Sequence, residues 1–198
     1  MAHDGRMDDA RAHRSLPSAG SLLVATAELL DPHFAESVVL LLDVSEDGVL
    51  GVVLNRPSDI AVAEVLDAWR STVGVPEVLF RGGPVSTDGV IGVGLLRDPD
   101  SPPVGWQQLD HALGVVDLET PTELVDNSLA GLRVYVGYAG WGADQLRGEI
   151  AEGSWYVVAS EPSDWFRVDT ATLWRDVIAR QPGTLAWHVT RPGDPELN

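Results

Sequence analysis

The chain has 198 residues, 13 of them basic and 30 acidic, and its formal net charge is −17. This length favours one domain with a sizeable core. There is no cysteine and every basic residue is arginine, which excludes disulfides, thiolate chemistry and lysine-dependent mechanisms such as Schiff-base formation.

The two ends of the chain differ from the part between them. Residues 1–19 are polar and lack apolar periodicity, which predicts a disordered tail, and residues 181–198 are expected to form an irregular tail. One domain is therefore predicted over residues 20–180. Pro17, Ser18 and Gly20 interrupt the segment that would have to be the hydrophobic part of a signal peptide, so we expect a cytoplasmic protein. No apolar run is longer than Val38–Leu42, which is far shorter than the ~20 residues of a membrane helix, and no membrane association is expected.

The first half of the domain is rich in short apolar runs. Strands are predicted at Leu22–Ala27, Ser37–Leu42, Val49–Leu54, Val75–Phe80 and Val90–Leu95. Runs without polar alternation indicate strands covered on both faces, and the turn residues Ser45–Gly48 predict a hairpin between the second and third strands. Helical spacing of apolar residues over Ala61–Trp69, after a cap at Ser58, predicts a helix.

The second half contains most of the expected helices. A capping box at Thr120–Glu123 predicts a short helix that ends before Gly131. Further strands are expected at Leu132–Tyr138 and Trp155–Ala159, and further helices over Ala143–Ile150 and Leu173–Ile178. Because strands cluster before helices appear, the pattern predicts a single α+β domain with a mixed, strongly curved sheet and three to four packed helices.

The seven tryptophans fall into two groups. Trp69, Trp141, Trp155 and Trp174 occupy apolar positions and are predicted to lie in the core. The other three, Trp106, Trp165 and Trp187, fall in segments expected to be loops, so they are candidates for exposed side chains.

Three polar or glycine-rich clusters each follow a predicted strand. They are Asn55-Arg56-Pro57, Arg81-Gly82-Gly83-Pro84-Val85 and Gly137-Tyr138-Ala139-Gly140-Trp141-Gly142. Loops at strand ends commonly carry binding sites, and arginine with nearby glycine amides suits an anion. Each cluster has an alternative explanation as turn chemistry or as packing beneath a helix.

From these clusters we predict one ligand-binding site at one end of the sheet. Its residues would be Asn55, Arg56, Gly82, Gly83, Tyr138 and Trp141. The ligand would be a small anion held by the arginine and by backbone amides. The alternative is that these residues interlock to hold three tight turns.

Other constellations argue against familiar catalytic sites. The five histidines show no metal-binding spacing, and no G-x-S-x-G motif is present. We therefore predict no catalytic residues, no metal and no cofactor.

The same clusters carry a resemblance to the YqgE/AlgH family of bacterial proteins. The matching segments are Gly20–Ala25, Asp31–Phe34, Ser37–Leu40, Gly51–Pro57, Gly82–Val85 and Gly137–Trp141, followed by Gln145-Leu146, Glu149 and Trp155. The resemblance spans Gly20 to Ile178 and implies a compact α+β domain whose mixed sheet curls into a pseudo-barrel. It implies no defined activity, although a label of transcriptional regulator accompanies the family. Asp43-Val44 and Asp144 depart from the family pattern, which usually has a histidine and a glycine there.

The sequence is compatible with three functions. The first is a binding or regulatory module that acts through a small anionic ligand or an unknown protein partner, as a monomer or a weak homo-oligomer. The second is an enzyme of undescribed type acting on an anionic small molecule. The third, a DNA-binding regulator, is disfavoured because an acidic body repels phosphate backbones and the arginines are scattered along the sequence.

Overall fold

The amino-terminal strands form an antiparallel meander in the computed structural model, which describes residues 16–181. Strands β1 (Leu22–Ala25), β2 (Val38–Val44) and β3 (Val49–Val53) pair in sequence order, and β2 and β3 form the predicted hairpin. Their β-branched, uninterrupted apolar sequences suit strands that are buried on both faces.

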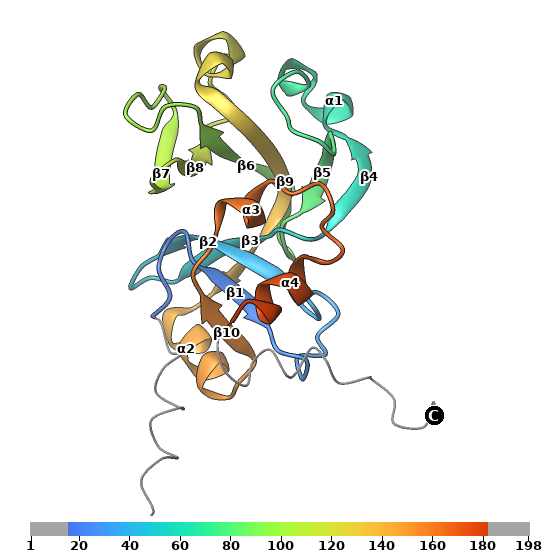
Figure 1. The fold of residues 1–198 in the computed structure, drawn as a ribbon, viewed down its shortest axis with the longest axis vertical. Helices are drawn as coiled ribbons and strands as arrows, with labels where there is room; N and C mark the ends of the chain where they lie inside the picture. Colours follow the sequence, from blue (N-terminus) through green and yellow to red (C-terminus); the bar gives the residue numbers. More distant parts are fainter. Residues whose placement is uncertain (1–15, 182–198) are drawn as a thin grey trace, which may run out of the picture.

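Seven further strands complete one strongly curved sheet. They are β4 (Pro57–Ala61), β5 (Val78–Arg81), β6 (Val85–Leu96), β7 (Trp106–Asp110), β8 (Leu113–Val116), β9 (Leu129–Trp141) and β10 (Trp155–Val158). The main strand order is β10-β1-β2-β3-β9-β6-β8-β7, and β5 joins β4 to β9. The long strand β9 runs through the middle of the molecule and pairs with β3, β5 and β6 (Figure 1). Because β5 and β9 are parallel and the other pairs are antiparallel, the sheet is mixed, as predicted.

Helices cover the sheet on opposite faces. The α-helices are α1 (Val62–Val65), α2 (Ala143–Ala151), α3 (Pro162–Trp165) and α4 (Leu173–Ala179). Alternate residues of β1 point into two apolar clusters: Leu22 packs with Leu173 of α4, and Leu23 packs with Leu146 of α2. The expectation of a single α+β domain with a curved mixed sheet is therefore confirmed.

Two helix predictions were wrong in extent. Ser58 lies in β4 and caps no helix, and the predicted helix over Ala61–Trp69 is one turn of α1 followed by a 3₁₀ turn at Asp67–Trp69. After Thr120 the chain forms only the 3₁₀ turns Thr122–Leu124 and Asp126–Ser128. In the second turn the Asp126 carboxylate accepts a hydrogen bond from the Asn127 amide, an alternative to helical pairing that short polar side chains favour.

The tryptophan predictions were partly right. Trp69, Trp141, Trp155 and Trp174 are all buried, as expected. Trp165, which was considered for exposure, is only 5% exposed because it lies in α3 against the sheet. Trp106 is half-buried in β7, where its indole packs over Gly114 of β8, and Trp187 lies outside the described residues.

The predicted tails at residues 1–19 and 181–198 lie almost entirely outside the described residues. Within residues 16–181, no helix has the length and apolar character needed to cross a membrane.

An arginine is buried inside the larger core cluster. Arg133 of β9 is 2% exposed, and its guanidinium lies 4.4 Å from the centre of the Phe80 ring. Nη1 donates to the carbonyl of Trp165 at 3.2 Å, and Nη2 donates to the carbonyl of Arg167. Among residues 16–181, no carboxylate pairs with it. Arg133 thus ties the chain that follows α3 to the inner face of β9.

Tyr135 lies on the same strand, and its hydroxyl has no hydrogen-bond partner among the described residues. Burial raises the pKa of Tyr135 to about 12, although the nearby Arg133 charge acts in the opposite direction. The neutral phenol is therefore the form that the folded protein favours.

This shift predicts alkaline sensitivity. An unfolded tyrosine ionises near pH 10 and folded Tyr135 only near 12. The free energy of unfolding should therefore fall by roughly 1.4 kcal/mol per pH unit across that window and be unaffected below it.

Urea unfolding of the wild type and of Tyr135→Phe from pH 8 to 11.5 measures this loss of stability. The variant should match or exceed wild-type stability at pH 8, since an unpartnered hydroxyl is removed, and should decline less steeply above pH 10. Some decline will remain, because burial and then Glu28 also raise the pKa of Tyr156. Parallel curves for the two proteins would contradict the prediction.

Candidate functional site: a pocket with two arginines

A pocket of about 630 Å³ opens where β3, β5 and β6 approach the turn before β2. Its lining residues are Pro32, His33, Val53, Arg56, Arg81, Gly83, Pro84, Thr87 and Val136. We call it the arginine pocket. It contains two guanidinium groups, an imidazole and a hydroxyl among otherwise aliphatic and glycine surfaces.

The two arginines are direct neighbours across the β4–β5 pairing. Pro57 is registered opposite Phe80, and one step further the Arg81 amide donates to the Arg56 carbonyl at 2.8 Å. Like charges placed opposite each other destabilise a strand pair. An arginine pair in this position is therefore a cost to folding that an anion bound between the two side chains would offset.

Asn55 and Arg56 also hold the turn that forms one wall of the pocket. The Asn55 carboxamide accepts from the Val38 amide at 3.0 Å and donates to the Glu36 carbonyl at 2.9 Å. Arg56 Nη2 donates to the carbonyl of Ala35. These contacts fix residues 32–36, and with them His33, against the end of β3.

Unusual backbone conformations border the pocket on both sides. Glu36 has φ 54° and Ser86 has φ 47°, and no other non-glycine residue of the described chain has positive φ. Glu36 ends the turn that carries His33, and Ser86 begins the bulge in β6 that carries Thr87. Strained residues of this kind cost about 1–3 kcal/mol each and concentrate at functional sites.

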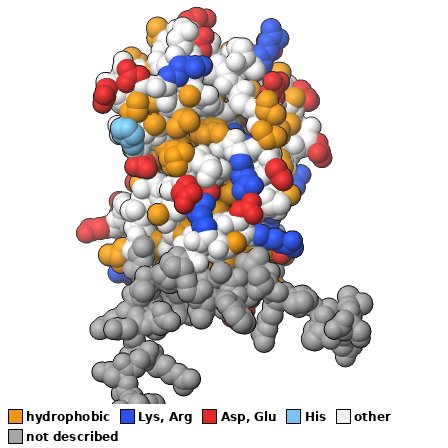
Figure 2. Space-filling view, in the orientation of Figure 1, with side chains coloured by type: hydrophobic (Ala, Val, Ile, Leu, Met, Phe, Trp, Pro, Cys, Tyr) orange, Lys and Arg blue, Asp and Glu red, His pale blue; other side chains and the backbone are white. Residues whose placement is uncertain are grey.

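The electrostatic character of the pocket contrasts with that of the protein. Thirty of the 198 residues are acidic, yet none lines the arginine pocket. Over residues 16–181, neither Arg56 nor Arg81 takes part in an ion pair, whereas four other arginines do. On the face drawn in Figure 2, acidic and arginine side chains are intermixed. The pocket is thus a local concentration of positive charge on an acidic protein.

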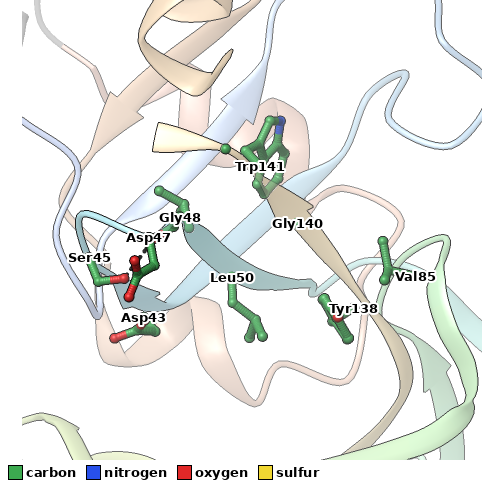
Figure 3. A pocket seen from close by; sticks show the side chains of 11 residues that line it. Asp43, Ser45, Asp47, Gly48, Leu50, Val85, Tyr138, Gly140 and Trp141 are labelled. Carbon is green, nitrogen blue, oxygen red and sulfur yellow. Dashed lines mark hydrogen bonds between the residues drawn. The ribbon is translucent and has the colours of Figure 1, made fainter. Parts of the chain in front are cut away.

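A second, shallower pocket of about 450 Å³ lies beside the β2–β3 turn. Asp43, Ser45 and Asp47 line one side, and Leu50, Val85 and Tyr138 line another (Figure 3). Asp43, one of the two departures from the family pattern, therefore faces this pocket. Asp144, the other departure, is exposed and pairs with Arg147 at 2.7 Å.

The six residues predicted from the sequence do not share one pocket. Arg56 and Gly83 line the arginine pocket, Tyr138 and Trp141 line the second pocket, and Asn55 and Gly82 line neither. Four of the six do meet near the carboxyl end of β3, namely Asn55, Arg56, Gly82 and Gly83. They meet because the Val53 amide donates to the Gly82 carbonyl at 2.9 Å. Trp141 lies opposite Val49, at the other end of β3.

Trp141 is held by aromatic packing and by a hydrogen bond within the protein. Its ring packs on Phe34 and at 90° to Trp155, with centroids 5.7 Å apart in both cases. The indole groups of Trp141 and Trp155 both donate to Glu149 Oε2, at 3.0 and 2.8 Å. In Figure 3 the Trp141 side chain extends from β9 on the side opposite to Tyr138. The packing alternative accounts for this residue.

The glycines serve close packing of the backbone. A Cβ atom on Gly82 would lie 2.2 Å from the Gly137 carbonyl oxygen, and one on Gly83 would lie 2.2 Å from the carbonyl carbon of Tyr138. The segment after β5 therefore approaches β9 so closely that only glycine fits. This close approach of the segment after β5 helps to place Arg81 beside Arg56 in the pocket.

Arg81, His33 and Thr87 also line the pocket but were not among the six predicted site residues. Arg81 was part of the predicted glycine-rich cluster that follows the Val75–Phe80 run. For Arg81 a signal was available, since it directly precedes the conspicuous Gly82-Gly83-Pro84 motif. The described part of the chain contains no group of three or more His, Cys, Asp or Glu side chains that could hold a metal ion.

Comparisons with known proteins place the chain among bacterial relatives. Residues 22–186 match the model of the AlgH-like family. A UPF0301 protein from Streptomyces avermitilis is 50% identical over 182 residues, covering 90% of this chain and 94% of the relative. Another from Thermobifida fusca is 46% identical over 192 residues, covering 92% and 96%.

Two solved structures share the fold. The crystal structure of a protein from Corynebacterium diphtheriae superposes with a TM-score of 0.86 at 33% identity, covering 94% of this chain and 98% of that one. The solution structure of the AlgH protein from Pseudomonas aeruginosa gives a TM-score of 0.66 at 24% identity, covering 91% and 98%. The second comparison supports the fold alone.

Proposed function

This chain belongs to the AlgH-like family, and we propose that it is a binding module for a small anionic molecule, which it takes up in the arginine pocket. The observation that carries the proposal is the Arg56–Arg81 cross-strand pair, which lines a pocket without acidic side chains in a protein of net charge −17. Arginine presents a planar fork of donors that matches carboxylate and phosphate groups. The strained turns that carry His33 and Thr87 are consistent with a binding role.

Arg81 is the better of the two arginines for a test. Its side chain is exposed and makes no hydrogen bond to another described residue, whereas Arg56 also holds the Ala35 carbonyl. Replacing Arg56 would disturb both the fold and the ligand. Replacing Arg81 removes charge from the pocket and leaves the turn before β2 intact.

We expect wild-type protein purified from its native host to retain a small anionic molecule and Arg81→Ala to lose it. Compared with wild type after the anion has been removed from both proteins, the variant should have an equal free energy of unfolding or one up to about 1 kcal/mol higher, because the cross-strand pair of like charges is gone. Native mass spectrometry detects the retained molecule, and urea unfolding measures the stability. Arg97→Ala, which removes one exposed arginine outside the pocket, is the matched control and should behave as the wild type.

The result also separates binding from catalysis. An enzyme acting on an anionic substrate would use the same pocket, and it would convert the retained molecule when that molecule is added back to the protein. Recovery of the unchanged molecule supports the binding module. Equal retention by Arg81→Ala and wild type would contradict the proposal.

A further inference from the structure

The arginine pocket offers more hydrogen-bond donors than a single bidentate pair with a carboxylate uses. In such a pair one guanidinium fork contacts both oxygens of the carboxylate. Here two guanidinium groups come from directly opposed residues, Arg56, whose Nη2 also donates to the Ala35 carbonyl, and Arg81, and Thr87 lies in the same lining. A phosphate monoester has three terminal oxygens and a charge of about −1.5 to −2 at pH 7. That group matches the number and the charge of these donors.

The β6 bulge gives Thr87 its position. Val85 is registered opposite Tyr138 and Val90 opposite Val136, so the residues between Val85 and Val90 are extra to the pairing. Ser86 adopts φ 47° at the start of this bulge, and the following residue, Thr87, lines the pocket. Bulges commonly redirect a side chain toward a site. The bulge thus places Thr87 in the same lining as the two arginines.

The rest of the lining limits what can be attached to the phosphate. Pro32, Val53, Pro84 and Val136 supply aliphatic surface, and the His33 imidazole is the one aromatic ring among the lining residues. Proteins that stack nucleic-acid bases use aromatic side chains, and a single imidazole offers a smaller stacking surface than Phe, Tyr or Trp. A compact, non-aromatic phosphate monoester fits this lining better than a nucleotide.

We infer that the arginine pocket selects the dianionic phosphoryl group of a small, non-aromatic phosphate monoester, an inference that rests on the anion-binding function proposed above. Arg56 and Arg81 hold the phosphoryl oxygens from two sides. Thr87 donates its hydroxyl to a third position. The aliphatic residues contact the remainder of the ligand.

Four soluble probes at pH 8 and constant ionic strength test this inference by calorimetric titration. They are glycerol phosphate, dimethyl phosphate, acetate and adenosine monophosphate. Glycerol phosphate should bind at least tenfold more tightly than dimethyl phosphate, which has one charge and two free oxygens, and than acetate. It should also bind more tightly than adenosine monophosphate. Arg81→Ala should abolish the binding, and Arg97→Ala should leave it unchanged.

Thr87 provides a second test that spares the charge. Thr87→Val removes the hydroxyl at nearly constant shape and should weaken glycerol phosphate binding about five- to tenfold, whereas Thr87→Ser should retain it. Unfolding curves should show that Thr87→Val remains folded. Wild-type affinity in Thr87→Val would contradict the assigned role of the hydroxyl.

The possible failures are distinguishable. If acetate or dimethyl phosphate binds as tightly as glycerol phosphate, the phosphoryl specificity is wrong while the anion-binding function stands. If no probe binds at millimolar concentration and no anion is retained from the host, both fail. Vesicles with and without phosphatidic acid address a lipid source, and binding to these vesicles without binding of soluble monoesters would overturn the inference.

Discussion

Replacement of Arg133 by alanine is expected to lower the free energy of unfolding by about 3–5 kcal/mol. Arg133 is 2% exposed. Its guanidinium is the hydrogen-bond donor to the carbonyls of Trp165 and Arg167 and lies over the Phe80 ring. Alanine would leave the two carbonyls without these donors and create a cavity in the largest core cluster.

The packing and polar contributions can be separated with Arg133→Met. Methionine fills most of the cavity and removes a buried charge that pairs with no carboxylate among residues 16–181, but it cannot donate to the carbonyls. We expect it to cost about 1–2 kcal/mol, the range for buried acceptors left without partners. Burial lowers the pKa of Arg133, which is the sign of a charge that is costly to bury.

Urea unfolding at pH 7 measures both variants, and Arg97→Ala is the exposed control that should stay within about 0.5 kcal/mol of the wild type. Hydrogen exchange adds a local readout, because only the segment after α3 should lose protection in Arg133→Met. A cost below about 1 kcal/mol for Arg133→Ala would show that this arginine does not stabilise the covering segment.

The strands that could be predicted were those whose sequence alone determines burial. Val38–Leu42 and Val49–Leu54 are continuous and β-branched, and the turn between them contains Gly48, so the hairpin followed directly. The hairpin of β7 and β8 was missed because Trp106 comes after three prolines. Its strand character depends on space above Gly114, where a Cβ atom would lie 2.4 Å from the indole. That contact is tertiary and has no local signal.

The arginine and glycine character of the site could be predicted from the sequence, but the set of residues that line it could be predicted only in part. Asn55, Arg56 and the paired glycines were recognised because each follows a buried strand. The pairing of Arg56 with Arg81 depends on the register of β4 and β5, which requires the bulged pairing between Pro57 and Ala61. Trp141 was grouped with them by sequence motif, but β3 places it one strand length away. The burial of Arg133 contradicts the usual exposure of arginine and became visible only with the segment that covers it.

Gly82 is a position where close backbone approach matters for the fold and for the neighbouring pocket. Its amide donates to the Val136 carbonyl at 2.8 Å, and its carbonyl accepts from the Val53 amide at 2.9 Å, so it bridges β9 and β3. A Cβ atom here would lie 2.2 Å from the Gly137 carbonyl oxygen and 3.1 Å from Tyr135 Cβ. Backbone and a β-carbon cannot move aside as a flexible side chain could.

Gly82→Ala should therefore destabilise the protein by about 3 kcal/mol, at the upper end of the cost of overpacking. Gly148→Ala is the matched control, since Gly148 is exposed in α2 and a Cβ atom there has no neighbour within 4 Å. The control should stabilise the protein by about 0.5–1 kcal/mol through helix propensity. Thermal and urea unfolding should show a lower free energy of unfolding for Gly82→Ala and a higher one for Gly148→Ala.

Because Gly82 also positions Arg81, any folded fraction of Gly82→Ala should bind glycerol phosphate more weakly than the wild type. A cost below about 1 kcal/mol with unchanged binding would show that the chain after β5 can move away from β9 without disturbing the pocket.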